Sequence, residues 1–172
     1  MELKEYIEEE FKHADQSLLE ALKDLTPEEI GYCPGPQCNS IGFILWHLAR
    51  GEDVWIQTVA LNKPQVWESE GWYQKFNMSS DPMDLGYEYT LEQLNAFSSP
   101  PIDALLGYYW TVRGRTLDYL HSLRPEKLNE MIRDPWSMNM SRGATIAHLI
   151  WELNQHIGQI AYLRGMQRGL DK

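Results

Sequence analysis

The sequence predicts an all-α protein built as a four-helix bundle. Four long segments place apolar residues three and four positions apart, the segments between them are rich in turn-forming residues, and no stretch shows the alternation typical of a β-strand. Helices of this kind bury their apolar faces against one another, which favours a bundle. At 172 residues the chain is long enough for one substantial core, so we expect a single domain over residues 1–172.

The first long helix is expected over residues 3–25, where the apolar residues follow helical spacing. Thr26 and the proline and glutamates after it can start a short helical turn, and the prolines and glycines of GYCPGPQCN then end regular structure. Asn39 or Ser40 can cap a second long helix that runs to about residue 61.

Residues 62–97 form a long, aromatic-rich connection, with one short helix expected after Thr90. Connections of this length in a compact domain are usually functional or disordered, and the aromatic residues indicate packed order. The third long helix is expected from Pro100 to about residue 123, because proline is tolerated in the first helical turn. After another loop, residues 143–165 form the fourth.

Composition excludes several classes of protein. The formal net charge is −10 and no basic run with interleaved aromatic residues occurs, which argues against nucleic acid and anionic membrane surfaces as partners. The sequence shows neither a signal-peptide core nor a membrane-spanning stretch, so we expect a cytoplasmic protein. Cys33 and Cys38 fit neither a disulfide framework nor a paired zinc knuckle, and we interpret them as loop thiols.

The fourth segment, GATIAHLIWELNQHIGQIAYLRG, spaces His148, Glu152 and His156 four residues apart. Two neighbours at this spacing share a helix face but supply at most two metal ligands, so a third must come from elsewhere. His47 is the candidate, because it lies in the apolar segment SIGFILWHLAR and a buried imidazole needs partners for its nitrogens.

A plainer interpretation of the same residues stays open. His47 can be a hydrogen-bonded core histidine, and Glu152 and His156 can be an ion pair on a solvated helix face. His13 and His121 lie on segments rich in charged residues, and we expect both at the surface.

Four motifs carry a resemblance over residues 5–168: YCPGPQCNSIGFILWHLAR, GWYQKF, LGYEY and HLIWELNQHIGQIAYLRG. Their order and spacing resemble the DinB-like superfamily, and within it a former unknown-function domain close to the thiol-dependent DinB-type transferases. The resemblance implies up-down-down-up connectivity, in which the long aromatic-rich segment crosses over between the second and third helices.

The resemblance also implies a divalent metal ion, Zn, Ni or Fe, held by His47 of the second helix and by Glu152 and His156 of the fourth. Glu152 stands where many relatives have histidine, which leaves three ligands and an open choice of metal. His148 is the rival ligand, because it too lies four residues from Glu152. No other catalytic residue is assigned.

In the thiol-using relatives the metal is thought to activate a low-molecular-weight thiol by lowering its pKa. We therefore expect a metal-dependent, thiol-using transferase or isomerase that acts on a small electrophile. The resemblance also implies a homodimer. The alternative is a non-catalytic, stress-related dimer that binds metal or a small ligand, and a third possibility is a vestigial metal constellation.

Two observations would inform this choice. Basic groups near the open face of the metal would favour an anionic thiol, and four arginines are available in the sequence: Arg50, Arg113, Arg142 and Arg164. If the long connection forms a wall of the site, one of its aromatic residues should approach the metal's open side, the candidates being Trp72, Tyr73, Phe76 and Tyr87.

Overall fold

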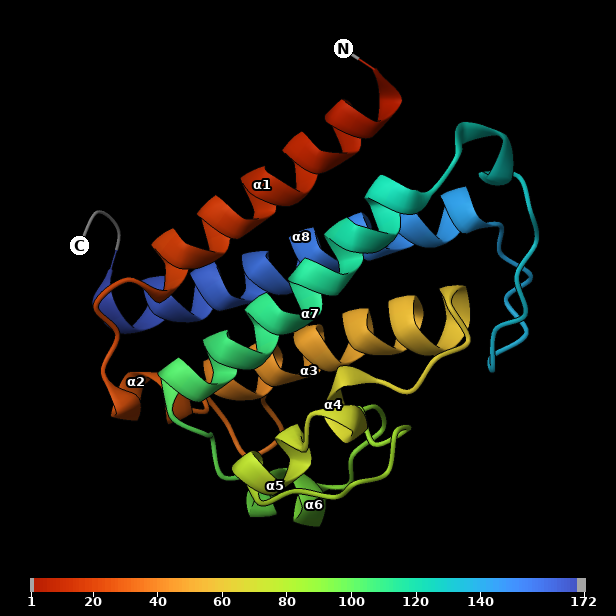
Figure 1. Ribbon diagram of the computed structural model, residues 1–172. Helices are drawn as coiled ribbons and strands as arrows, with labels where there is room; N and C mark the ends of the chain where they lie inside the picture. The colour runs from red at the N-terminus through yellow and green to blue at the C-terminus, as the bar shows by residue number, and fades with distance from the viewer. Residues whose placement is uncertain (1, 170–172) are drawn as a thin grey trace.

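The computed structural model describes residues 2–169, which form helices and loops without a named strand (Figure 1). The long helices are α1 (Leu3–Leu22), α3 (Ile41–Asp53), α7 (Ile102–Ser122) and α8 (Arg142–Arg168), and α3 continues as the π-helix η1 (Val54–Ala60). The shorter ones are α2 (Pro27–Gly31), α4 (Val66–Ser69), α5 (Trp72–Phe76), α6 (Leu91–Ala96) and the 3-10 turn η2 (Pro125–Lys127). The predicted all-α class is confirmed.

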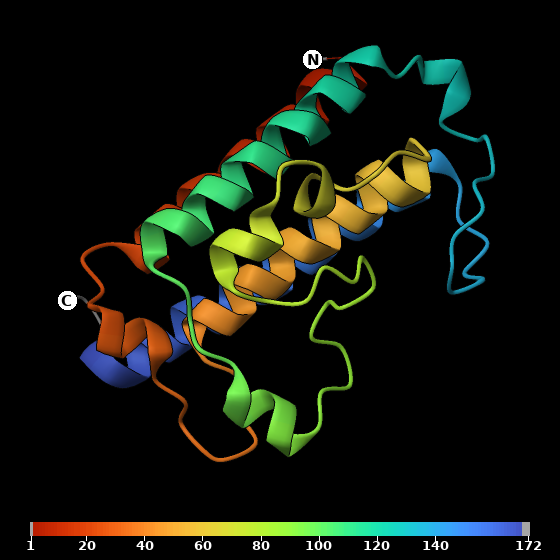
Figure 2. The same cartoon turned by 60° about the horizontal axis from the view of Figure 1, so that its bottom comes forward.

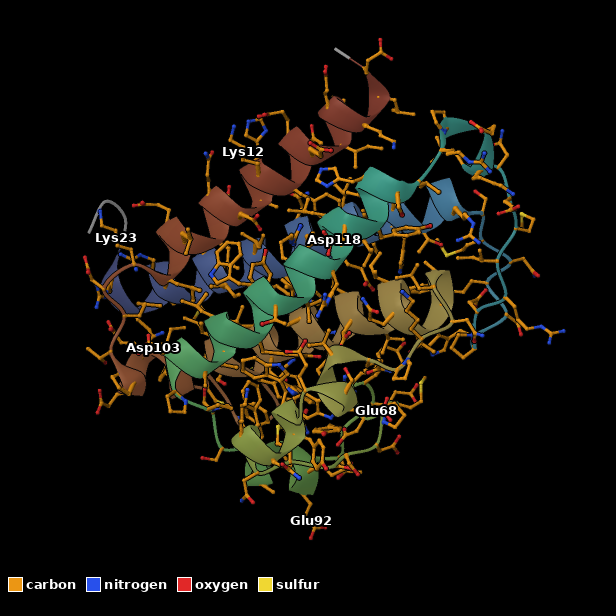
Figure 3. All side chains as sticks on the ribbon, in the orientation of Figure 1. Lys12, Lys23, Glu68, Glu92, Asp103 and Asp118 are labelled. Atoms are coloured by element: carbon orange, nitrogen blue, oxygen red, sulfur yellow. The ribbon has the colours of Figure 1, made fainter. Side chains whose placement is uncertain are left out.

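The four long helices lie side by side, with α1 packed on α8, α8 on α3, and α3 on α7. In Figure 1, α3 and α7 run in one direction and α1 and α8 run in the other. Apolar residues of all four helices form one continuous core. Charged side chains such as Lys12, Glu92 and Asp118 project outward around it (Figure 3). Within residues 2–169, no helix is long and apolar enough to cross a membrane.

Side-chain caps set several helix starts. Ser40 precedes α3 and accepts a hydrogen bond from the backbone N–H of Phe43 at 3.1 Å. Of the two predicted candidates, Asn39 and Ser40, Ser40 is therefore the N-cap residue. Ser141 caps α8 in the same way. The predicted turn after Thr26 and the predicted helix after Thr90 are both present, each with a capping box.

Two of the predictions about the helices were wrong. The first helix ends at Leu22 rather than at residue 25, and Asp24 adopts a positive φ of 57° that a continuing helix cannot contain. The second helical segment reaches Ala60, close to the predicted end at about residue 61, with π-helical hydrogen bonding from Val54 onward. The long connection contains three short helices instead of one, because α4 and α5 are shorter than the window in which helical periodicity can be recognised.

Buried charges of α3 hold this connection in place. The carboxylate of Asp53 accepts hydrogen bonds from the backbone N–H groups of Val66 at 3.0 Å and Trp67 at 2.9 Å. Arg50 donates to the side chain of Gln65 at 2.5 Å and to the Pro82 carbonyl at 2.9 Å. The connection therefore lies over α3 (Figure 2), with its backbone groups satisfied by side chains of the helix beneath.

A second buried network joins α1, α3 and α7. Arg113 lies 3.0 Å from the carboxylate of Glu52 and 3.6 Å from that of Asp15, and Thr116 donates to Glu52 at 2.6 Å. Arg113 and Glu52 are both about 2% exposed. Because each buried charge has a partner of opposite sign, this network belongs to the interior of the fold.

Candidate functional site

Helix α3, together with its continuation η1, runs antiparallel to α8 and meets it along a seam of three residue pairs. The rings of His47 and His156 lie 4.9 Å apart between centroids. One turn along, Glu152 Oε2 lies 3.9 Å from the point that a Cβ would occupy on Gly51. A further turn along, the rings of Trp55 and His148 lie 5.1 Å apart. The four-residue spacing in both helices thus aligns the predicted ligands along one line.

His47 is oriented by a backbone carbonyl. Its Nδ1 lies 2.5 Å from the carbonyl oxygen of Leu85, in the long connection. A carbonyl can only accept a hydrogen bond, so Nδ1 carries the proton and Nε2 of the neutral ring keeps its lone pair. Burial lowers the pKa of His47 below its ordinary value, although the Leu85 hydrogen bond and the Glu152 charge act against this. The lowered pKa favours the neutral ring.

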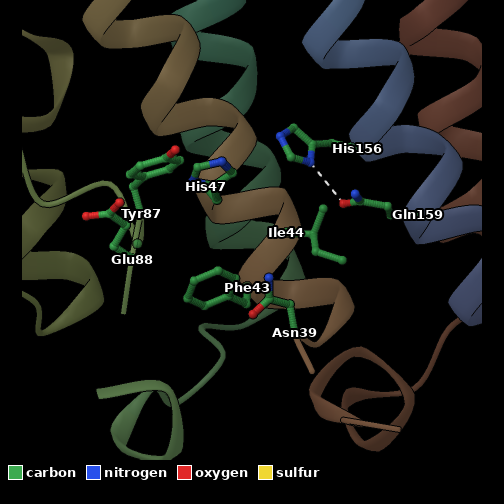
Figure 4. Close-up of a pocket in the computed structure, with 9 residues that line it drawn as sticks. Asn39, Phe43, Ile44, His47, Tyr87, Glu88, His156 and Gln159 are labelled. Carbon is green, nitrogen blue, oxygen red and sulfur yellow. Dashed lines mark hydrogen bonds between the residues drawn. The ribbon is translucent and has the colours of Figure 1, made fainter. Parts of the chain in front are cut away.

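His156 has an equivalent partner. Its Nδ1 lies 3.0 Å from Oε1 of Gln159, one turn further along α8 (Figure 4). An amide oxygen also accepts only, so His156 donates from Nδ1, and in the neutral ring Nε2 keeps a lone pair. A ring nitrogen tied to an oxygen, with the other nitrogen left as an electron-pair donor, is the usual arrangement of a metal-binding histidine.

Glu152 turns toward His148 rather than toward the two facing histidines. Its Oε1 lies 3.3 Å from Nε2 of His148, and His148 also stacks on Trp151 with ring centroids 5.5 Å apart. Over residues 2–169, no three His, Cys, Asp or Glu side chains lie close enough together to hold a metal ion. The structure thus brings His47 and His156 together, whereas the assignment of Glu152 as the third ligand stays a prediction.

A pocket of 260 Å³ opens beside the two histidines. It is lined by Asn39, Phe43, Ile44, His47, Gly86, Tyr87, Glu88, His156 and Gln159. Figure 4 shows the residues from the connection, Tyr87 and Glu88, across from those of α8. The long connection therefore forms one wall of this pocket through residues 86–88.

Of the four aromatic residues considered for this wall, only Tyr87 is among the described residues that line the pocket. Trp72 and Phe76 instead pack against Tyr108 on α7, with ring centroids 5.5 Å and 5.9 Å from it. Tyr73 packs against the hydrophobic core. Trp72 and Phe76 therefore hold the connection against α7, because burying large rings there stabilises the fold.

No Lys or Arg is among the described residues that line the pocket. Arg50 and Arg113 are buried in the networks above, Arg142 pairs with Glu130, and Arg164 donates to the Lys23 carbonyl. The charged group contributed by the connection is instead the carboxylate of Glu88. Sequence reasoning missed Asn39, Gly86 and Glu88 as pocket residues, since no periodicity or motif spacing links them to His47.

Cys33 and Cys38 are both exposed free thiols in the loop between α2 and α3, as predicted. Partial desolvation of its sulfur, followed by the neighbouring Cys38, raises the pKa of Cys33. A raised pKa favours the protonated thiol, which is a weaker nucleophile than the thiolate.

Comparison with known proteins gives a consistent result. Residues 10–160 match a family model described as the DinB superfamily. A crystal structure described as a conserved protein of locus from Enterococcus faecalis is similar, with a TM-score of 0.83 and 25% sequence identity over 96% of this chain and 97% of that one. None of the curated proteins compared with the chain matches it.

Proposed function

We propose that this protein, which belongs to the DinB superfamily, binds one divalent metal ion and uses a low-molecular-weight thiol to attack a small electrophile, as a transferase or isomerase. One observation supports the proposal most strongly: the rings of His47 and His156 face each other and both line one pocket. Each Nδ1 is hydrogen-bonded to an oxygen, which leaves Nε2 of each neutral ring free to donate its lone pair. We also infer the up-down-down-up bundle of the family, which the helix directions support.

The residues present fit such an ion in their chemistry. His47 and His156 would hold it through Nε2, and Glu152 would supply the third ligand after turning away from His148. Two imidazoles and a carboxylate suit Zn, Ni or Fe and leave at least one position open. When bound, the ion supplies Lewis acidity that lowers the pKa of a coordinated thiol.

The chain itself shapes the rest of the site. The carbonyl of Leu85 keeps the His47 ring in one tautomer and one orientation, and Gln159 does the same for His156. Phe43 and Ile44 are buried and contribute apolar side chains to the lining of the pocket. The rim is formed by Tyr87 of the connection, whose exposed hydroxyl is available to hydrogen-bond a ligand.

Metal binding is tested by elemental analysis of protein purified without a histidine tag. We expect about one transition-metal ion per chain, loss of that ion in His47→Ala, and retention in His121→Ala. His121 is the matched control because it is exposed, contacts Glu8 at 3.1 Å and lies outside the pocket. Failure of the wild-type protein to take up zinc or nickel would contradict the proposal.

A second candidate is a non-catalytic, stress-related protein that binds metal or a small ligand. The pocket favours it in one respect, because no basic group lines it among the described residues to hold an anionic thiol. Titration of the metal-loaded protein with a panel of thiols separates the two. A saturable, metal-dependent response supports the thiol-using enzyme, whereas no response to any thiol favours the binding protein.

We further propose that the protein is a homodimer, as the family habit of pairing through bundle helices suggests. The exposed face of α8 supports this, since it presents Trp151, Tyr162 and Met166 to solvent. Light scattering at micromolar concentration should give about twice the chain mass of 20.1 kDa. A mass equal to that of one chain would contradict the proposal.

A further inference from the structure

The pocket beside His47 and His156 has an uneven distribution of charge. Its described lining includes one acidic side chain, Glu88, and no Lys or Arg. Glu88 lies in the connection, where it has a positive φ of 55° and is exposed. The protein as a whole carries a formal charge of −10, which makes a negative contribution to the electrostatic potential around the pocket.

The pocket also presents aromatic rings beside that carboxylate. Tyr87 precedes Glu88 directly, and Phe43 lines the same pocket from α3 (Figure 4). Aromatic faces together with a carboxylate are the usual means of recognising an ammonium group, through cation–π attraction and charge pairing. A sulfonate, phosphate or carboxylate would find no cationic partner among the described residues of this wall.

From this charge distribution we infer that the pocket selects a small thiol carrying a cationic head group over one carrying an anionic head group, and that Glu88 sets this preference. The inference rests on the proposed function, because it assumes that a thiol sulfur occupies the open position at the metal. Glu88 and Tyr87 then contact the far end of the same ligand. The class of ligand expected is a short aminothiol or quaternary-ammonium thiol.

The test uses three thiols in which two carbons separate the sulfur from the head group: thiocholine, 2-mercaptoethanesulfonate and neutral 2-mercaptoethanol. Each is added to the metal-loaded protein. Their dissociation constants are measured by calorimetry at low ionic strength. Because the thiols differ in their own acidity, the deciding quantity is how far a substitution changes the ratio of the thiocholine constant to the sulfonate constant. Comparing variants cancels that intrinsic difference.

We expect Glu88→Gln to reduce the preference for thiocholine by about threefold and Glu88→Lys by about tenfold, as is usual for exposed charges. The Glu88→Gln effect should shrink in 0.5 M salt, which screens charges more than a few ångströms apart. Glu68→Gln is the matched control, since Glu68 is also an exposed glutamate of the connection but lies outside the pocket. It should leave the ratio unchanged.

The outcomes separate this inference from the proposed function. If 2-mercaptoethanol binds in a metal-dependent way but Glu88→Gln changes the ratio no more than Glu68→Gln does, charge selection by Glu88 is overturned and the proposed function stands. If none of the three thiols binds the metal-loaded protein, both are overturned. Altered folding of a variant is recognised by its circular dichroism and by its binding of 2-mercaptoethanol, which carries no charge for Glu88 to act on.

Discussion

Replacing Gly86 with alanine should destabilise the fold and weaken metal binding at the proposed site. Gly86 has a φ of +78°, a region that residues with a Cβ rarely adopt. A Cβ there would lie 2.6 Å from Cζ of Phe43 and 2.7 Å from Cζ3 of Trp46. Both rings are buried, at 3% and 0% exposure, so they have little space into which to retreat. The connection must therefore move away from α3.

The size of the effect follows from two contributions. The left-handed backbone costs alanine about 1–2 kcal/mol. Overpacking against closely packed rings costs about 1–3 kcal/mol more. Together they lower the free energy of unfolding by about 2–5 kcal/mol, or the melting temperature by roughly 5–20 °C for a chain of this length. Because Leu85 adjoins Gly86 and its carbonyl orients His47, metal affinity should fall about 10–100-fold.

Two measurements check this reasoning: denaturant unfolding of the metal-free protein, and zinc competition against a chromophoric chelator. Gly71→Ala is the control, because Gly71 has a similar φ of +67° but its Cβ would meet nothing closer than 3.4 Å. It should lose only the backbone contribution and keep its zinc affinity. The reasoning is refuted if Gly86→Ala is no less stable than Gly71→Ala and binds zinc as the wild type does.

Two further predictions concern ion pairs away from the pocket. Arg113→Leu should lower the free energy of unfolding by about 3–5 kcal/mol, because it leaves the buried Glu52 carboxylate without the Arg113 guanidinium. In a double-mutant cycle, adding Glu52→Leu should recover part of that loss. If the two losses simply added, this explanation would be contradicted. Hydrogen bonds from Arg168 lower the pKa of Glu29 from 4.5 to about 2. Since the folded-state value is the lower one, the stability from this pair is present above pH 4.5 and is lost as the pH falls toward 2. Carboxyl NMR titration should show that midpoint, and Arg168→Gln should move it toward 4.5, whereas equal midpoints in both proteins would exclude the effect.

The sequence by itself determined the helical class and the positions of the long helices. Periodicity identifies a helix because one apolar face must be buried, and Ser40 and Ser141 mark helix starts through hydrogen bonds to residues only three positions away. These are local relations, readable along the chain. The same holds for the spacing of Glu152 and His156, which puts both on one line of α8 before any neighbour is known.

Only the tertiary structure decided how the pocket is completed. His47 is oriented by the carbonyl of Leu85, which lies 38 positions further along the chain. Because every residue has a backbone carbonyl, the identity of residue 85 could not predict this contact. The path of the connection depends on two buried charged side chains of α3. Arg50 donates a hydrogen bond to the Pro82 carbonyl, and Asp53 accepts one from the backbone N–H of Val66. That path in turn brings Glu88 to the pocket. Long-range placement of this kind follows from packing and from pairing of buried polar groups, which are properties of the folded chain rather than of any short stretch of it.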